Sequence, residues 1–153
     1  MSYPREAINE ALKLLPAKMD TPMSRVLLAA IGFQESDGYA TRVQYGNGPA
    51  RSYWQFERGG IKGVMLHAAS ARLAIEVCEA RGVDFNSEAI WQAMETDDVL
   101  GAAFARLLMW TDSQPLPTTA QGAWEMYANR LWRPGKPHAS KWAKSWAFGL
   151  ANA

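Results

Sequence analysis

Apolar residues recur every three or four positions along most of the chain, which is the spacing of amphipathic helices. The first such segment, residues 4–15, is stopped by Pro16. The second is expected to begin at Thr21-Pro22, because proline suits a first helical turn, and to run to about Glu35. This second segment is apolar nearly all round, so we expect it to be the central buried helix.

The remainder of the chain predicts one long loop followed by further helices. Residues 37–58 contain three glycines and Pro49, and they indicate a loop or a short hairpin. Loops of this length in a compact domain usually carry function. Helical spacing predicts further helices over residues 59–69 and 71–81, the second of them ended by Gly82. Capping residues predict one helix that begins at Ser87 and runs to Met94, one that begins at Thr96 or Asp97 and runs to Trp110, and one that begins at Thr118-Thr119 and runs to about residue 131. A last helix is expected from about Ser140, with Trp142, Trp146 and Leu150 facing inward. We therefore expect an all-α fold, with an α-rich α+β fold as the alternative if the hairpin forms.

Size and composition are those of an ordinary globular protein. The chain has 153 residues, 48% of them hydrophobic and 20% charged, which argues against disorder and fits a single domain over residues 1–153. Cys78 is the only cysteine, so no internal disulfide can form, and we expect it to be a small buried side chain.

The net charge of +1 argues against a dedicated nucleic-acid binder, but the charges are unevenly distributed. Residues 76–98 carry seven acidic side chains and one basic one, whereas no acid follows Glu125 and five lysines and arginines do. The basic end is suited to an anionic polymer such as cell wall, phospholipid or nucleic acid. A solvated surface without a partner is the more common meaning of such a pattern.

Glu35 is the leading candidate for chemistry. It ends the apolar segment and is followed at once by Ser36, Asp37 and Gly38. A carboxylate at the C-terminus of a buried helix is partly desolvated and disfavoured by the helix dipole, and both effects favour the protonated form that a general acid needs. The alternative is an ordinary carboxylate paired with a neighbouring lysine or arginine.

Two further clusters carry polar groups among aromatic rings. Gln55 lies between Trp54 and Phe56, where its amide can hold a hydroxyl or acetamido group while the rings pack on sugar faces. Tyr127, with Asn129 close behind it, can reach the acid or the substrate with its hydroxyl. For Gln55, a turn of partly buried aromatics beside a strand end is the more common meaning of such a segment taken alone. For Tyr127, a core stripe with Trp124 and Leu131 fits equally well.

Other kinds of site lack support in the sequence. His67 and His138 are far apart and have no cysteine or acidic partner at ligand spacing, so we expect no metal. No glycine-rich phosphate loop and no Gly-x-Ser-x-Gly motif is present. We expect no cofactor.

With these residues in place, the chain resembles the lysozyme-like superfamily, most closely the soluble lytic transglycosylase and goose-type lysozyme branch. Residues 29–38 look like its first motif, an apolar helix ending in Glu-Ser before a glycine. Residues 49–55 are similar to its Gly-Leu-Met-Gln motif, with Ser52-Tyr53-Trp54 in place of Gly-Leu-Met. Residues 97–104 look like the helix that follows, and residues 125–129 resemble its Ala-Tyr-Asn segment with one residue inserted.

The resemblance implies a lysozyme-like fold and cleavage of peptidoglycan between N-acetylmuramic acid and N-acetylglucosamine, by a lytic transglycosylase or a muramidase. It implies Glu35 as general acid and base. The candidate substrate-binding residues are Ser36, Tyr53, Gln55, Phe56, Tyr127 and Asn129. A hydrolase of the two-carboxylate type needs a second acid, and neither Asp37 nor Glu57 belongs to a recognisable pattern, so a route with one carboxylate is favoured.

The sequence is compatible with two other functions. One is a non-catalytic wall-binding or virion structural module that keeps the fold as a scaffold, and the other is a chitinase-like hydrolase. The sequence of residues 48–57, around Gln55, also resembles lysozyme-like proteins of phages and prophages, among them endolysins. With no signal-like apolar segment at its start, the chain is expected in the host cytoplasm or a virion, as a monomer or virion component. Glycan strands are its expected partner, and neither nucleic acid nor a membrane is expected.

Overall fold

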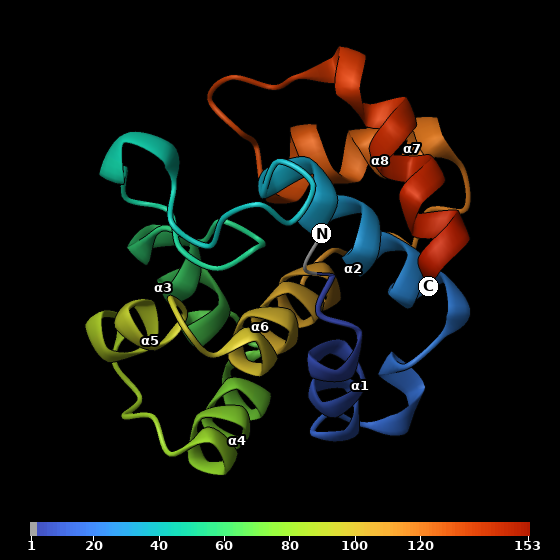
Figure 1. The fold of residues 1–153 in the computed structure, drawn as a ribbon. Coiled ribbons are helices and arrows are strands. Elements are labelled where there is room, and N and C mark those ends of the chain that lie inside the picture. Colours follow the sequence, from blue (N-terminus) through green and yellow to red (C-terminus); the bar gives the residue numbers. More distant parts are fainter. Residues whose placement is uncertain (1–2) are drawn as a thin grey trace.

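Two buried helices, α2 (Pro22–Glu35) and α6 (Asp98–Trp110), run through the middle of the computed structural model, which describes residues 3–153 (Figure 1). Around α6 lie α1 (Arg5–Lys13), α3 (Arg58–Leu66), α4 (Ala71–Arg81) and α5 (Ser87–Ala93). On the other side, α8 (Ala139–Asn152) packs on α2, and α7 (Ala120–Trp124) packs on α8. Met1 and Ser2, on which the expectation about the start of the chain partly depends, lie outside the described residues.

The all-α prediction is confirmed. Residues 3–153 contain helices and no strand; the segment between α2 and α3 forms only isolated bridges, Val43 with Arg51 and Arg51 with Phe56. Short helical turns complete the chain, two of the 3-10 type at Ala17–Met19 and Tyr45–Asn47, and one π-helix at Glu125–Leu131. The α+β alternative is therefore not observed in this part of the chain.

Side-chain caps fix several helix starts where the sequence places them. Thr21 accepts a hydrogen bond from the Ser24 backbone N–H at 3.0 Å, and the Ser24 hydroxyl accepts one from the Thr21 N–H at 2.9 Å, so the pair forms a reciprocal capping box. The Asp97 side chain caps α6 by accepting a hydrogen bond from the Leu100 N–H at 3.0 Å, without a reciprocal bond. For α5 the cap is Asn86 and not the expected Ser87, because the Asn86 side chain accepts from the Ala89 N–H.

The core differs from expectation in having two central helices instead of one. In α2, every residue from Val26 to Gly32 is buried, as its apolar sequence predicts. In α6, the run from Val99 to Leu107 is also buried throughout. Small residues at positions 101–103 and 105 let neighbouring elements approach α6 from several sides, which an alternating pattern of apolar residues does not reveal.

Helix α8 crosses α2 closely at Gly149. A Cβ atom at this position would lie 2.6 Å from the backbone oxygen of Val26, so only glycine fits. Because Gly149 faces α2, the next residue points outward, and the expectation that Leu150 faces inward is wrong: its side chain is 58% exposed. Trp142 is buried and Trp146 is half-buried, as the sequence indicates.

The buried residues around α6 and those around α2 form one hydrophobic cluster. Cys78 lies in it on α4, as expected, and burial raises the pKa of its thiol to about 11. Of the helices within residues 3–153, none has the length and apolar character needed to span a bilayer.

Candidate active site

A cleft of about 590 Å³ opens where three parts of the chain meet, namely the end of α2, the loop between α2 and α3, and the turn before α8. Three of the candidate site residues line it together, Glu35, Gln55 and Tyr127. The other lining residues are Gln34, Thr41, Gln44, Tyr45, Ala50, Glu57, Trp132, Arg133, Pro134, Gly135, Lys136 and His138. Glu35 and Tyr127, which are 92 positions apart in sequence, therefore lie together in the wall of this cleft.

Glu35 is held in an environment that favours its proton. Its side chain is largely buried at the last residue of α2, and burial raises its pKa from 4.5 to about 7. The Tyr127 hydroxyl donates a hydrogen bond to Oε1 of Glu35 at 2.8 Å, and this bond opposes the rise because it stabilises the charged form. No lysine or arginine pairs with Glu35 among residues 3–153, so the carboxyl is not the ordinary surface ion pair considered above.

Tyr127 lies in a π-helix, and its hydroxyl reaches Glu35 from there. The segment Glu125–Leu131 continues α7 in this wider form, which takes up one more residue than an α-helical stretch. The Tyr127 ring stacks on Trp142 of α8, with centroids 5.4 Å apart and planes within 5°. Burial and the nearby Glu35 both raise the pKa of the Tyr127 hydroxyl, so it remains a proton donor in the hydrogen bond.

Gln55 reaches the cleft from a tight turn. Arg51 and Phe56 exchange backbone hydrogen bonds of 2.8 and 2.7 Å, and the four residues between them form the turn, with Gln55 at a positive φ of 53°. Within this turn Trp54 points into the core, where its indole N–H donates to the Leu28 oxygen at 2.9 Å. The Gln55 amide nitrogen donates to the Ser52 oxygen at 2.8 Å, which leaves its side-chain oxygen for a ligand.

The walls of the cleft are fastened to the core by charged and aromatic contacts. Arg42 forms a bidentate pair with Asp98 at the start of α6, with distances of 2.7 and 2.9 Å. Trp132 donates from its indole N–H to the Trp54 oxygen at 2.9 Å and so joins the two sides of the cleft. These links position the site before any ligand arrives.

Ser36 does not line the cleft, although it follows the acid directly. Its side chain is fully buried; the hydroxyl donates to the Gly32 oxygen and accepts from the Tyr39 N–H at 2.7 Å. Both bonds hold the turn that leaves α2. Ser36 therefore shapes the loop beside the acid and is not placed to contact a substrate.

Three more of the expected substrate contacts also lie elsewhere. Tyr53 and Phe56 are 2% and 3% exposed, because the tight turn directs them into the aromatic core, where Tyr53 packs on Tyr39 and Phe56 on Phe104. Asn129 is exposed but is not among the residues that line the cleft.

The structure separates the two acids considered as a second carboxylate. Glu57 lines the cleft together with Glu35. Asp37 turns away from it, into a neighbouring hollow, and its Oδ2 accepts a hydrogen bond from the Tyr45 hydroxyl at 3.0 Å. Glu57 is thus the second carboxylate of the cleft within residues 3–153.

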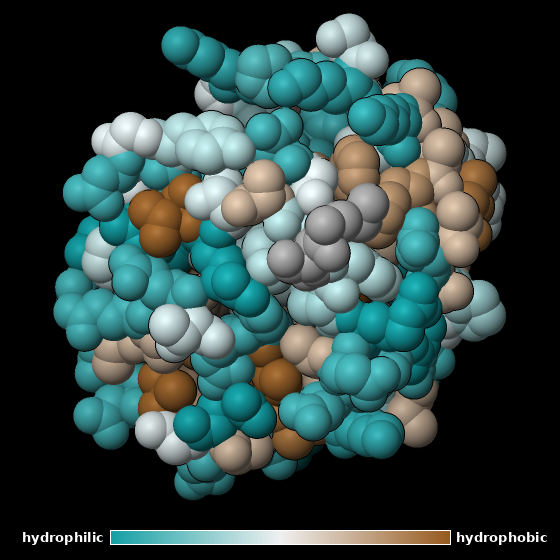
Figure 2. Space-filling view, in the orientation of Figure 1, coloured by the Kyte–Doolittle hydropathy of each residue, from teal (hydrophilic) through white to brown (hydrophobic). Residues whose placement is uncertain are grey.

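Several cleft residues were not among the candidates. Tyr45 is 65% exposed, although it lines the cleft, and it offers an open aromatic face of the kind on which sugar rings pack. Arg133, Lys136 and His138, from the turn before α8, add polar groups to the lining of the cleft. Hydrophilic side chains gather along the upper edge of the face shown in Figure 2, over this turn. The excess of basic residues after Glu125 drew attention to this turn, but the sequence did not indicate that the turn lies beside Glu35.

No group of three histidine, cysteine, aspartate or glutamate side chains that could hold a metal ion occurs within residues 3–153. No protein-family model, curated protein or solved structure matched the chain when it was compared with them.

Proposed function

We propose that the protein cleaves the glycan strands of peptidoglycan, between N-acetylmuramic acid and N-acetylglucosamine, with Glu35 as general acid and base. The observation that carries the proposal is the Glu35 carboxyl itself. It lies in the wall of an open cleft, is held by Tyr127 and has a pKa of about 7, so a large share of it is protonated near neutral pH.

In the proposed reaction, Glu35 gives its proton to the glycosidic oxygen as the bond to the leaving sugar breaks. The resulting carboxylate then accepts the proton of the muramyl 6-hydroxyl, whose oxygen closes an anhydro ring on the same sugar. One carboxylate serves both steps, first as acid and then as base. Gln55 offers its side-chain oxygen to a sugar hydroxyl or amide N–H, and Tyr45 offers a face for a ring.

A muramidase is the second candidate, and Glu57 is the observation that favours it. Because Glu57 lines the same cleft as Glu35, water activated by a second carboxylate is an alternative to ring closure. The two reactions differ in their products: hydrolysis adds water to the cleaved end, and ring closure does not.

Incubation with purified peptidoglycan, followed by mass spectrometry of the soluble fragments, tests the proposal. A transglycosylase releases fragments with anhydro ends, which are lighter by about one water than the reducing ends left by hydrolysis. Glu79→Gln on α4, an exposed position away from the cleft, is the matched control for Glu35→Gln. A protein that sediments with the wall but releases no fragments is a binding module, and a protein that releases fragments only from chitin is a chitinase; either result contradicts the proposal.

A further inference from the structure

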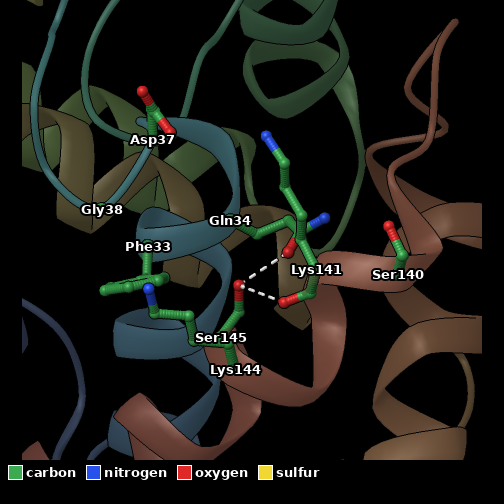
Figure 3. A pocket seen from close by; sticks show the side chains of 8 residues that line it. All are labelled: Phe33, Gln34, Asp37, Gly38, Ser140, Lys141, Lys144 and Ser145. Carbon is green, nitrogen blue, oxygen red and sulfur yellow. Dashed lines mark hydrogen bonds between the residues drawn. The ribbon is translucent and has the colours of Figure 1, made fainter.

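A second hollow, of about 510 Å³, lies beside the cleft between the end of α2 and the first turns of α8 (Figure 3). We call it the lysine pocket; it is lined by Phe33, Gln34, Asp37, Gly38, Ser140, Lys141, Lys144 and Ser145. In Figure 3, Lys144 extends from α8 to the side of Phe33, whereas Lys141 extends past Gln34 toward the end of the pocket that carries Asp37. The pocket therefore combines an apolar ring with two ammonium groups, at a size suited to a small ligand.

The lysine pocket and the cleft share their walls. Gln34 lines both hollows; its amide nitrogen donates to the His138 oxygen at 3.1 Å, and its amide oxygen accepts from the Ser145 hydroxyl at 2.6 Å. The hydrogen bond between Asp37 and Tyr45 forms a second shared boundary, because Asp37 lines the pocket and Tyr45 lines the cleft. The lysine pocket and the cleft are therefore neighbours, with Gln34 in the wall of both.

The two lysines have charge to offer a ligand. Neither Lys141 nor Lys144 forms an ion pair with any residue from 3 to 153. The chain after Glu125 contains no acidic side chain that could neutralise them. Asp37 is the one acid that lines the pocket, and it is already bonded to Tyr45.

We propose that the lysine pocket binds the peptide stem that branches from N-acetylmuramic acid, with Lys141 and Lys144 on its carboxylates. This inference rests on the proposed function, since it assigns a further part of the same substrate to a site next to the cleft. The stem leaves the glycan on the lactyl group of the sugar whose bond is cut, so a strand in the cleft needs room for its stem beside the cleft, and the lysine pocket is a hollow that adjoins it.

The composition of the pocket favours a peptide over a phosphate-rich wall polymer. Stem peptides carry carboxylates, alanine methyl groups and, at the diamino acid, an amino group. Lys141 and Lys144 suit the carboxylates, Phe33 suits the methyl groups, and Asp37 suits the amino group. A polymer that offers only phosphates has no amino group to offset the like charge of Asp37, whereas the stem has one.

The first test measures binding without catalysis. A free stem tripeptide, L-Ala-γ-D-Glu-meso-diaminopimelate, is titrated into the wild type and into Lys141→Ala/Lys144→Ala, and amide chemical shifts are followed by NMR. We expect shifts around residues 33–38 and 140–145 in the wild type and a Kd higher on the order of tenfold in the double variant. Lys13→Ala/Lys62→Ala, which removes two exposed lysines away from both hollows, is the matched control and keeps the wild-type Kd.

The second test measures substrate preference. Cleavage of stem-bearing strands is compared with cleavage of strands from which an amidase has removed the peptides, as a ratio of kcat/KM values. The double variant is expected to lower this ratio on the order of tenfold, whereas the control double variant keeps it.

The two tests separate this inference from the proposed function. If the wild type cleaves neither strand but binds the tripeptide through the lysine pocket, the catalytic proposal is wrong and the pocket stands. If the wild type cleaves strands and the double variant keeps both the wild-type Kd and the wild-type ratio, the inference is overturned. Shifts at the pocket with inorganic phosphate or a teichoic-acid fragment, but not with the tripeptide, overturn it as well.

Discussion

The hydroxyl of Tyr127 donates a 2.8 Å hydrogen bond to Oε1 of Glu35 and so connects the end of α2 to the π-helix that follows α7. Burial of Glu35 raises its pKa, and this hydrogen bond opposes the rise. The balance of these two effects leaves the pKa of the carboxyl at about 7, where one group can serve as an acid and then as a base.

The pH dependence of cleavage follows from this value. A general acid must be protonated, so kcat/KM is expected to fall as the pH rises through about 7, by about tenfold per pH unit above it. The measurement is the initial rate of fragment release at low substrate concentration from pH 5 to 9. An alkaline limb that begins near the ordinary value of 4.5 would show that the carboxyl is not desolvated in solution.

Tyr127→Phe is expected to move that alkaline limb upward. The variant keeps the ring that stacks on Trp142 but loses the hydrogen bond that lowers the pKa of Glu35, so that pKa should rise, by roughly one pH unit. The same rate profile measures the change. Tyr3→Phe, at an aromatic contact outside the cleft, is the control, and a limb that moves downward in Tyr127→Phe contradicts the account.

Glu35→Gln is expected to stabilise the protein at neutral pH. The pKa of Glu35 is raised in the folded state, so the stability it contributes is present below about 4.5 and is lost as the pH rises through about 7. Glutamine carries no charge to desolvate and can still accept from Tyr127. Since one pKa unit corresponds to about 1.4 kcal/mol, the rise from 4.5 to about 7 predicts a gain of roughly 3–4 kcal/mol in urea unfolding at pH 8 that is absent at pH 4. Equal gains at both pH values would exclude this linkage.

The close crossing of α2 and α8 gives a test of the fold that does not involve the cleft. Gly149→Ala places a Cβ 2.6 Å from the Val26 backbone oxygen, and we expect a loss of roughly 1–3 kcal/mol in the free energy of unfolding. Gly63→Ala is the matched control: this glycine lies inside α3 with open space around it, so alanine should stabilise by up to about 1 kcal/mol. Thermal or urea unfolding distinguishes the two, and equal effects would contradict the crossing.

Most of the helices, and several of their first and last residues, could be predicted from the sequence because they depend on local signals. Thr21, Asp97 and Thr119 all cap helices through their own side chains, and Gly82 is the C-cap that ends α4 where the pattern stops. The first helix ends at Lys13, a little before the expected stop at Pro16. Glu35 was likewise visible, since its place after a long apolar run already implies burial at a helix end.

The rest depended on geometry that spacing does not encode. Ser52 and Gln55 both adopt positive φ, and this turn sends Tyr53 and Phe56 into the core while it leaves Gln55 at the cleft. The pattern of apolar residues does not predict the π-helix that carries Tyr127. The separation of Glu57 from Asp37 depends on the path of the whole loop, which only the folded chain reveals.

The most direct test of the central claim is the rate at which Glu35→Gln releases soluble fragments from purified peptidoglycan at pH 6, beside wild type and Glu79→Gln. The account predicts that Glu35→Gln stays folded and loses activity by a factor on the order of 10²–10⁴, while Glu79→Gln keeps the wild-type rate. Fragment release by a folded Glu35→Gln at the wild-type rate would contradict it.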